Sequence, residues 1–146
     1  MKIGIVSDHR GYELKQKLIE ELAKANYEII NYGTDSEESV DYPDYAFILG
    51  ENVATKQVDF GVAICGSGIG ISIACNKVKG VRCAKVTNEQ EAQITRNDND
   101  ANVVAFSSEI PVEIALNIVK KFVNTPFSSE ERHQKRINKI TNYEDK

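Results

Sequence analysis

The sequence predicts an α/β fold in which a five-stranded parallel sheet is covered by helices on both faces. Short, nearly continuous apolar runs alternate along the chain with longer stretches whose apolar residues recur at helical spacing. Strands that are apolar on both faces are typical of parallel sheets buried between helices. Five such strands indicate an open, doubly wound sheet, which binds ligands beyond the carboxyl ends of its strands. The 146 residues suffice for one domain, 1–146.

The predicted elements follow one another in a regular order. Apolar runs predict strands over residues 2–8, 27–33, 59–65, 81–87 and 101–107. Leu14, Leu18 and Leu22 recur at helical spacing and share one face of the first helix. Helices are predicted over residues 12–25, 42–55, 69–78, 88–96, 110–123 and 129–143. Pro43 and Pro111 fall near the starts of two of them, where proline is tolerated.

The composition narrows the classes of function. A formal net charge of −4 argues against nucleic acid as the main partner. No apolar stretch approaches the roughly 20 residues that span a bilayer, and the charge at Asp8 interrupts any signal peptide, so we expect no membrane partner. Cys65, Cys75 and Cys83 form no CxxC pair, and an odd number leaves one thiol over. Reduced cysteines in a cytoplasmic protein are therefore expected.

The most informative motif is ICGSGIG at 64–70. Cys65 ends an apolar run and opens directly into a glycine-rich loop that leads into a predicted helix. A thiol there faces unpaired backbone N–H groups and the positive end of a helix dipole, which favour a thiolate and an oxyanion beside it. We therefore predict chemistry on a small anionic substrate. Cys75 and Cys83 have no glycine loop beside them and are interpreted as buried packing residues.

The glycines of this loop have a second interpretation, as a dinucleotide-binding turn. Their spacing is GxGxG, and the third glycine of the fingerprint GxGxxG would fall on Ile71. The loop also follows the third predicted strand, whereas the fingerprint follows the first. A nucleotide site is therefore disfavoured. Glycines that permit a positive φ in a tight turn also aim backbone N–H groups at one point, so a structural and a functional role are compatible here.

Polar residues follow the other predicted strands as well. Asp8 and His9 follow the first strand, and Asp41 and Tyr42 end the loop after the second, where Asp41 is in position to cap the next helix. Because the carboxyl ends of parallel strands meet at one edge, we expect these loops to converge with the cysteine loop. The cluster RNDNDAN at 96–102 precedes the fifth strand and is interpreted as capping and turning residues.

Two arginines mark the last predicted helix. Arg132 and Arg136 are spaced i, i+4 and share a face, whereas His133 and Lys135 point elsewhere. Such a pair is either an ordinary solvated surface or a clamp for a phosphate. On spacing alone the solvated surface is the better interpretation.

Six segments together resemble one known family. They stand in matching order and spacing along essentially the whole chain: SDHRG (7–11), DYPDY (41–45), CGSGIGISIACNK (65–77), GVRCA (80–84), NDNDANV (97–103) and ERHQKR (131–136). The chain resembles the type B ribose-5-phosphate isomerases, a family that also contains the galactose-6-phosphate isomerase subunits. The resemblance implies a Rossmann-like three-layer α/β/α sandwich and aldose–ketose isomerisation without metal, nucleotide or other cofactor. It also implies a homodimer with shared active sites, which can pair into a tetramer.

The resemblance implies roles for individual residues. Cys65 matches the catalytic base that moves a proton between C2 and C1 of the open-chain sugar, and the Ser67 hydroxyl is placed to orient the thiol. The residues that match the family's sugar-binding positions, including the loop amides for the enediolate oxygen, are Asp8, His9, Tyr42, Gly66, Gly68, Ile69, Gly70 and Asn99. Those that match phosphate-binding positions are His9, Arg132 and Arg136. Some of these side chains would come from the partner subunit.

Two positions depart from the family pattern. Asp98 stands where the family usually has a histidine that opens the furanose ring, and Glu109 stands where an arginine often lies near the phosphate. A carboxyl group acts as an acid near neutral pH only where burial or a neighbouring negative charge favours its protonated form. We expect interconversion of ribose 5-phosphate and ribulose 5-phosphate, and two alternatives stay open. One is an isomerase of a hexose 6-phosphate of the galactose or allose type, and the other is a catalytically weak sugar-phosphate-binding protein.

Overall fold

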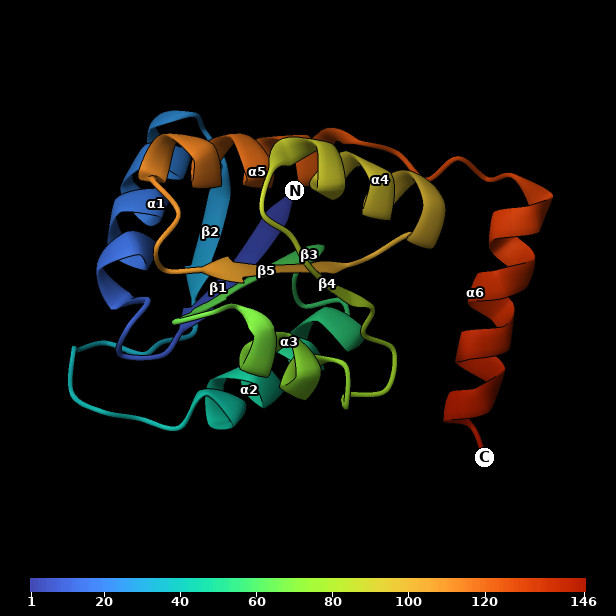
Figure 1. The fold of residues 1–146 in the computed structure, drawn as a ribbon, viewed down its shortest axis with the longest axis horizontal. Coiled ribbons are helices and arrows are strands. Elements are labelled where there is room, and N and C mark those ends of the chain that lie inside the picture. The colour runs from blue at the N-terminus through green and yellow to red at the C-terminus, as the bar shows by residue number, and fades with distance from the viewer.

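A five-stranded parallel sheet forms the centre of the molecule (Figure 1). The structure is a computed structural model that describes residues 1–146. Its strands are β1 (Lys2–Ser7), β2 (Glu28–Asn31), β3 (Phe60–Cys65), β4 (Cys83–Lys85) and β5 (Val103–Ser107). They lie in the order β2-β1-β3-β5-β4, and all neighbouring pairs are parallel.

Helices cover both faces of this sheet. They are α1 (Tyr12–Lys24), α2 (Tyr42–Ala54), α3 (Ile69–Cys75), α4 (Glu89–Asn99), α5 (Val112–Asn124) and α6 (Glu131–Glu144). Figure 1 shows α1, α4 and α5 on one face, α2 and α3 on the other, and α6 standing apart from the three layers. The predicted three-layer α/β/α sandwich with a C-terminal helix is confirmed. No helix has both the length and the apolar composition needed to cross a bilayer.

Two apolar clusters explain why the strands read as continuous apolar runs. Along β1, Ile3 and Ile5 belong to the cluster under α1, α4 and α5, whereas Val6 belongs to the cluster under α2 and α3. In β3, Val62 and Ala63 divide between the same two clusters, and both are fully buried. Successive side chains of a strand point to opposite faces, so a sheet buried on both sides requires apolar residues at every position.

The order of the strands fixes where a ligand can bind. The chain leaves β1 through α1 on one face to reach β2, and it leaves β3 through α3 on the other face to reach β4. The connections from the adjacent strands β1 and β3 therefore run in opposite directions. In doubly wound sheets such a switch point opens a crevice at the carboxyl ends of the two strands. Asp8 follows β1 at this place, and the loop after Cys65 follows β3.

Several boundaries differ from the sequence prediction. Helix α3 ends at Cys75, and β4 is shorter than predicted because only Cys83–Lys85 pairs with β5. Helix α4 runs on to Asn99, so that Asp98 and Asn99 form a last helical turn where a loop was predicted. Asp41 occupies the N-cap position of α2, but its side chain makes no capping hydrogen bond. The predicted N-cap position is therefore confirmed, although the side chain makes no hydrogen bond to the helix.

Candidate active site

Cys65 is the last residue of β3 and lies at the switch point. It is only 4% exposed, and its Sγ accepts a hydrogen bond of 3.2 Å from the Gly68 N–H. Gly68 has φ +78, and a Cβ there would lie 2.6 Å from the carbonyl carbon of Phe106. Only glycine can make this turn without moving the backbone of β5. The turn therefore directs an amide donor at the sulfur.

The rest of the glycine loop is held from β5. Ser107 Oγ donates to the Gly66 carbonyl at 2.7 Å, and the Ser108 N–H donates to the Cys65 carbonyl at 2.9 Å. The N–H groups of Gly66 and Ser67 donate to no acceptor in the chain. An anchored loop with free amide donors is suited to hold an oxyanion.

The hydroxyl of Ser67 has a partner other than the thiol. Ser67 Oγ accepts from the Ile69 N–H at 3.1 Å, and no hydrogen bond joins it to Cys65. In this state Ser67 shapes the entry into α3. Its expected role in orienting the thiol stays a prediction.

The loop after β1 brings two more predicted residues to the same edge. Asp8 is 5% exposed, and its Oδ1 accepts from the N–H groups of Arg10 and Gly11, each at 3.0 Å. This turn fixes the chain as it enters α1. His9 Nδ1 accepts from the Val40 N–H at 3.2 Å, so the neutral ring carries its proton on Nε2.

Two long side chains cover glycines of the loop. A Cβ on Gly70 would lie 2.6 Å from Cζ of Tyr42, the first residue of α2, so the phenol ring packs directly on Gly70. A Cβ on Gly66 would lie 2.8 Å from Nη1 of Arg10. A side chain at either position would have to displace the phenol or the guanidinium from the loop. Arg10 brings a cation beside the loop, and the sequence motif SDHRG gave no sign of this role.

The other predicted residues form a second group, at the end of α4 and the start of α6. Asp98 Oδ1 accepts from Asn97 Nδ2 at 2.8 Å, and Asn99 Oδ1 accepts from Thr95 Oγ1 at 3.0 Å. His133, on the first turn of α6, is 4% exposed and contacts Asp98, with 3.8 Å between Nε2 and Oδ1. Helix α6 is thus joined to the end of α4.

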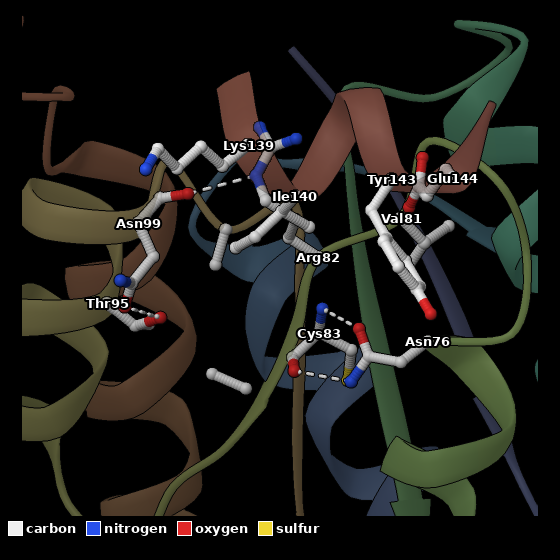
Figure 2. Close-up of a pocket in the computed structure, with 12 residues that line it drawn as sticks. Asn76, Val81, Arg82, Cys83, Thr95, Asn99, Lys139, Ile140, Tyr143 and Glu144 are labelled. Carbon is white, nitrogen blue, oxygen red and sulfur yellow. Dashed lines mark hydrogen bonds between the residues drawn. The ribbon is translucent and has the colours of Figure 1, made fainter. Parts of the chain in front are cut away.

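The two arginines of α6 lie on the exposed side of this group. The Arg132 side chain is 64% exposed, and its Nε donates to Glu130 Oε2 at 2.8 Å. Arg136 follows one turn later and is also exposed. Between α6 and the body of the protein lies a cavity of about 670 Å³ (Figure 2). Figure 2 shows Asn99 in its wall, with Arg82 Nε donating to the Asn99 carbonyl at 3.0 Å.

A single chain does not bring the two groups together. The end of α4 leads into the start of β5, where Val103 pairs with Gly61, whereas Cys65 pairs with Ser107 at the far end of the same ladder. Four strand residues span about 13 Å, so Asp98 and Cys65 lie at opposite edges of the sheet. In Figure 1 the arrowhead of β5 points away from α6.

The fold and motifs agree with comparisons to known proteins. Residues 3–140 match the family described as Ribose/Galactose Isomerase. Ribose-5-phosphate isomerase B of Escherichia coli is 40% identical over 141 residues, which cover 96% of this chain and 94% of the relative. The chain belongs to the ribose/galactose isomerase family. The expectation of a sugar-phosphate isomerase is confirmed at this level.

Solved structures of the family superpose closely. Ribose-5-phosphate isomerase B of Clostridium thermocellum has a TM-score of 0.95 at 44% identity, covering 99% of this chain and 98% of that one. The Mycoplasma genitalium enzyme, solved with bound ribulose-5-phosphate, has a TM-score of 0.93 at 37% identity. That match covers 99% of this chain and 97% of the other. This chain therefore has the architecture of the solved family members, as the resemblance implied.

The two departures from the family pattern have defined surroundings. The Asp98 side chain is partly exposed to solvent, and one of its carboxyl oxygens faces the buried imidazole of His133. Glu109 is exposed in the turn after β5, and its N–H donates to Ser107 Oγ at 3.0 Å. Glu109 and Arg10 line the same cavity of about 360 Å³ beside the glycine loop. The Glu109 carboxylate and the Arg10 guanidinium thus border one cavity without forming an ion pair.

The remaining cysteines behave as packing residues. Cys75 is fully buried, and Cys83 is half-buried against the same cluster. The pKa of the Cys83 thiol lies well above its ordinary value. The main cause is a hydrogen bond with Cys75, and the second cause is burial of the thiol. The Cys83 thiol therefore stays protonated and unreactive near neutral pH.

Proposed function

We propose that this protein interconverts ribose 5-phosphate and ribulose 5-phosphate through an enediolate, with Cys65 as the base. The observation that carries the proposal is the position of the sulfur. Cys65 Sγ lies at the switch point of the sheet with the Gly68 N–H directed at it, next to an anchored loop with free amides. The name of the Escherichia coli relative and the ligand of the Mycoplasma genitalium structure support the choice of sugar.

The proposed reaction uses this loop in two ways. The thiolate of Cys65 removes the proton from C2 of the open-chain aldose and returns it to C1. Between these steps the proton of the C2 hydroxyl passes to O1 of the enediolate, so that O1 becomes a hydroxyl and C2 a carbonyl. The N–H groups of Gly66 and Ser67 donate to the enediolate oxygen as its negative charge develops. Removing one such donor typically costs about 3 kcal/mol of barrier. Ser67 Oγ reaches the thiol or the sugar once substrate displaces the Ile69 N–H.

The other predicted residues bind and open the sugar. Asp8, His9 and Tyr42 hold the sugar at the Cys65 edge, and His9 also contacts the phosphate through Nε2–H. Asn99 contacts the sugar, and Asp98 opens the ring. A phosphate is held by Arg132 and Arg136, which both project from α6. We assign four of these side chains to the second subunit: Asp98, Asn99, Arg132 and Arg136.

We further propose a homodimer with shared active sites in the cytoplasm. Two halves of one site at opposite edges of the sheet can only meet if a second copy supplies one of them. Exposed apolar side chains support a contact surface: Ile69 and Ile73 on α3 are 54% and 57% exposed, and Ile140 and Tyr143 on α6 are 51% and 73% exposed. Three free cysteines fit a reducing compartment.

Turnover by the purified protein tests this function. Wild-type protein should interconvert the two pentose phosphates, and Cys65→Ala should abolish turnover without lowering the melting temperature by more than a few degrees. Cys83→Ala is the matched control, because it also removes a thiol but from a site remote from the glycine loop, and it should keep turnover. Normal activity of Cys65→Ala would exclude Cys65 as the base. Binding of ribose 5-phosphate without turnover would instead identify a sugar-phosphate-binding protein.

A hexose 6-phosphate is the second candidate substrate. Asp98 and Glu109 favour it, because both change the charge at positions that lie near the ring and the phosphate in the family pattern. The comparison of kcat/KM over ribose, allose and galactose phosphates decides between the candidates. A clear preference for ribose 5-phosphate excludes the hexose phosphate.

A further inference from the structure

His133 is a buried titratable side chain that the proposed reaction does not use. The residue is 4% exposed, and its ring lies between two segments far apart in the sequence. Nδ1 is 2.8 Å from Ser128 Oγ, and Nε2 is 3.8 Å from Asp98 Oδ1. The Ser128 N–H also donates to the Asn97 carbonyl at 3.1 Å. The imidazole therefore sits in a closed contact between the end of α4 and the start of α6.

The hydrogen bonds indicate which nitrogen carries the proton. Ser128 Oγ accepts from the Glu130 N–H at 3.2 Å, which leaves its own hydrogen free to donate to His133 Nδ1. With Nδ1 as acceptor, the neutral ring carries its proton on Nε2, which faces Asp98. The opposite tautomer would turn a nitrogen lone pair toward a carboxylate, which is repulsive.

Asp98 is consequently held from one side only. Its Oδ1 accepts from Asn97 Nδ2 at 2.8 Å and faces His133 Nε2. The carboxyl group is 41% exposed, and no hydrogen bond within the chain engages Oδ2. A carboxylate fixed through one oxygen presents the other in a defined direction.

We propose that His133 is a positioning residue that, together with Asn97, holds Asp98 so that Oδ2 alone serves ring opening. This inference rests on the proposed function. Asp98 Oδ2 takes the proton of the anomeric hydroxyl, the C1–O1 bond becomes a carbonyl, and the C1–O4 bond breaks. Its electron pair goes to O4, which takes the same proton from Oδ2. The carboxylate is regenerated, and no further reactant is needed.

Exchange between the two anomers of ribose 5-phosphate measures this step by itself. The anomers interconvert through the open-chain aldehyde, so magnetisation transfer between their NMR signals reports ring opening. Cys65→Ala protein is used as the parent because it should not consume the sugar by isomerisation. The parent should accelerate anomer exchange, and Asp98→Asn should remove the acceleration. A parent that gives no acceleration would overturn the proposal.

Two substitutions of His133 separate positioning from folding. His133→Asn keeps an acceptor near the place of Nδ1 for Ser128 but has no group that reaches Asp98. His133→Gln places an amide N–H near the position of Nε2 and keeps the donor toward Asp98. Because a misplacement of about 1 Å costs on the order of 100-fold, we expect His133→Asn to slow the accelerated exchange by about 10- to 100-fold. His133→Gln should retain it within a few-fold.

The pair of His133 variants decides between positioning and folding. Equal losses of exchange rate for His133→Asn and His133→Gln would show a merely structural role and overturn the proposal. Should His133→Asn not fold, Ser128→Ala is the second variant, and an unchanged exchange rate there overturns it too. Failure of the proposed function is seen separately, as absent isomerisation by wild-type protein.

Discussion

Mixing of two inactive variants tests whether the site is shared between subunits. Cys65→Ala removes the proposed base at the carboxyl edge of the sheet, and Arg136→Ala removes a proposed phosphate contact from α6 at the other side of the molecule. Each variant alone should be inactive or nearly so. In a mixed dimer, one site combines the intact Cys65 of one subunit with the intact Arg136 of its partner, and the other site lacks both.

The recovered activity follows from the pairing. If subunits exchange at random at equal concentration, about half of the dimers are mixed and each of these has one complete site of two, so the mixture should show about 25% of wild-type activity. Co-refolding followed by a ribulose 5-phosphate assay measures it. Cys65→Ala mixed with Asp8→Asn is the matched control, because both residues lie at the same edge of one chain and no complete site can form. No recovery in the first mixture, or equal recovery in both, would refute a shared site.

Three further predictions concern single positions. Gly68→Ala and Gly80→Ala each force an L residue into a positive φ, +78 and +91, at a cost of about 1–2 kcal/mol. Only the Cβ at Gly68 would also meet backbone, at 2.6 Å from Phe106. Urea unfolding should therefore show a larger loss of unfolding free energy for Gly68→Ala than for Gly80→Ala. Burial lowers the pKa of Lys15 from 10.5. Between the lowered pKa and pH 10.5, the unfolded chain therefore binds more protons at Lys15 than the folded protein does. In this pH range the contribution of Lys15 to the free energy of unfolding rises with pH. Lys15→Met should remove that rise, as measured by urea unfolding at increasing pH. Glu109→Arg should lower KM for sugar phosphates more than it changes kcat, and an unchanged KM would show that Glu109 is remote from the phosphate.

The sequence predicts the sheet well because strands that are buried on both faces appear in it as nearly continuous apolar runs. It predicts strand ends less well at the edge of the sheet. Val81 and Val86 are buried, which made 81–87 look like a strand, but only Cys83–Lys85 pairs with β5. Apolar periodicity reports burial and not hydrogen bonding in the ladder.

The last turn of α4 was missed for a related reason. Asparagine and aspartate favour caps and turns because their side chains compete for backbone hydrogen bonds. Here tertiary and local contacts override that preference: Thr95 Oγ1 bonds Asn99 Oδ1, and Arg96 Nη1 bonds Asp100 Oδ1 at 2.6 Å. Arg96 is 8% exposed and also donates to the Ala101 carbonyl. A single sequence does not show which polar residues will find such partners.

The role of His133 could not be predicted from the sequence. A histidine on a charged helix, on a different face from its two arginines, is expected to be exposed to solvent. Only its contact with Asp98, a residue distant along the chain, gives it a role. The division of the site into two groups, by contrast, follows from topology alone. Residues that follow a strand, such as Asp8 and Cys65, lie at the carboxyl edge of a parallel sheet, and residues that precede one, such as Asp98 before β5, lie at the amino edge. When two motifs of one reaction fall on opposite edges by this rule, the order of the strands along the sequence is enough to indicate a partner subunit.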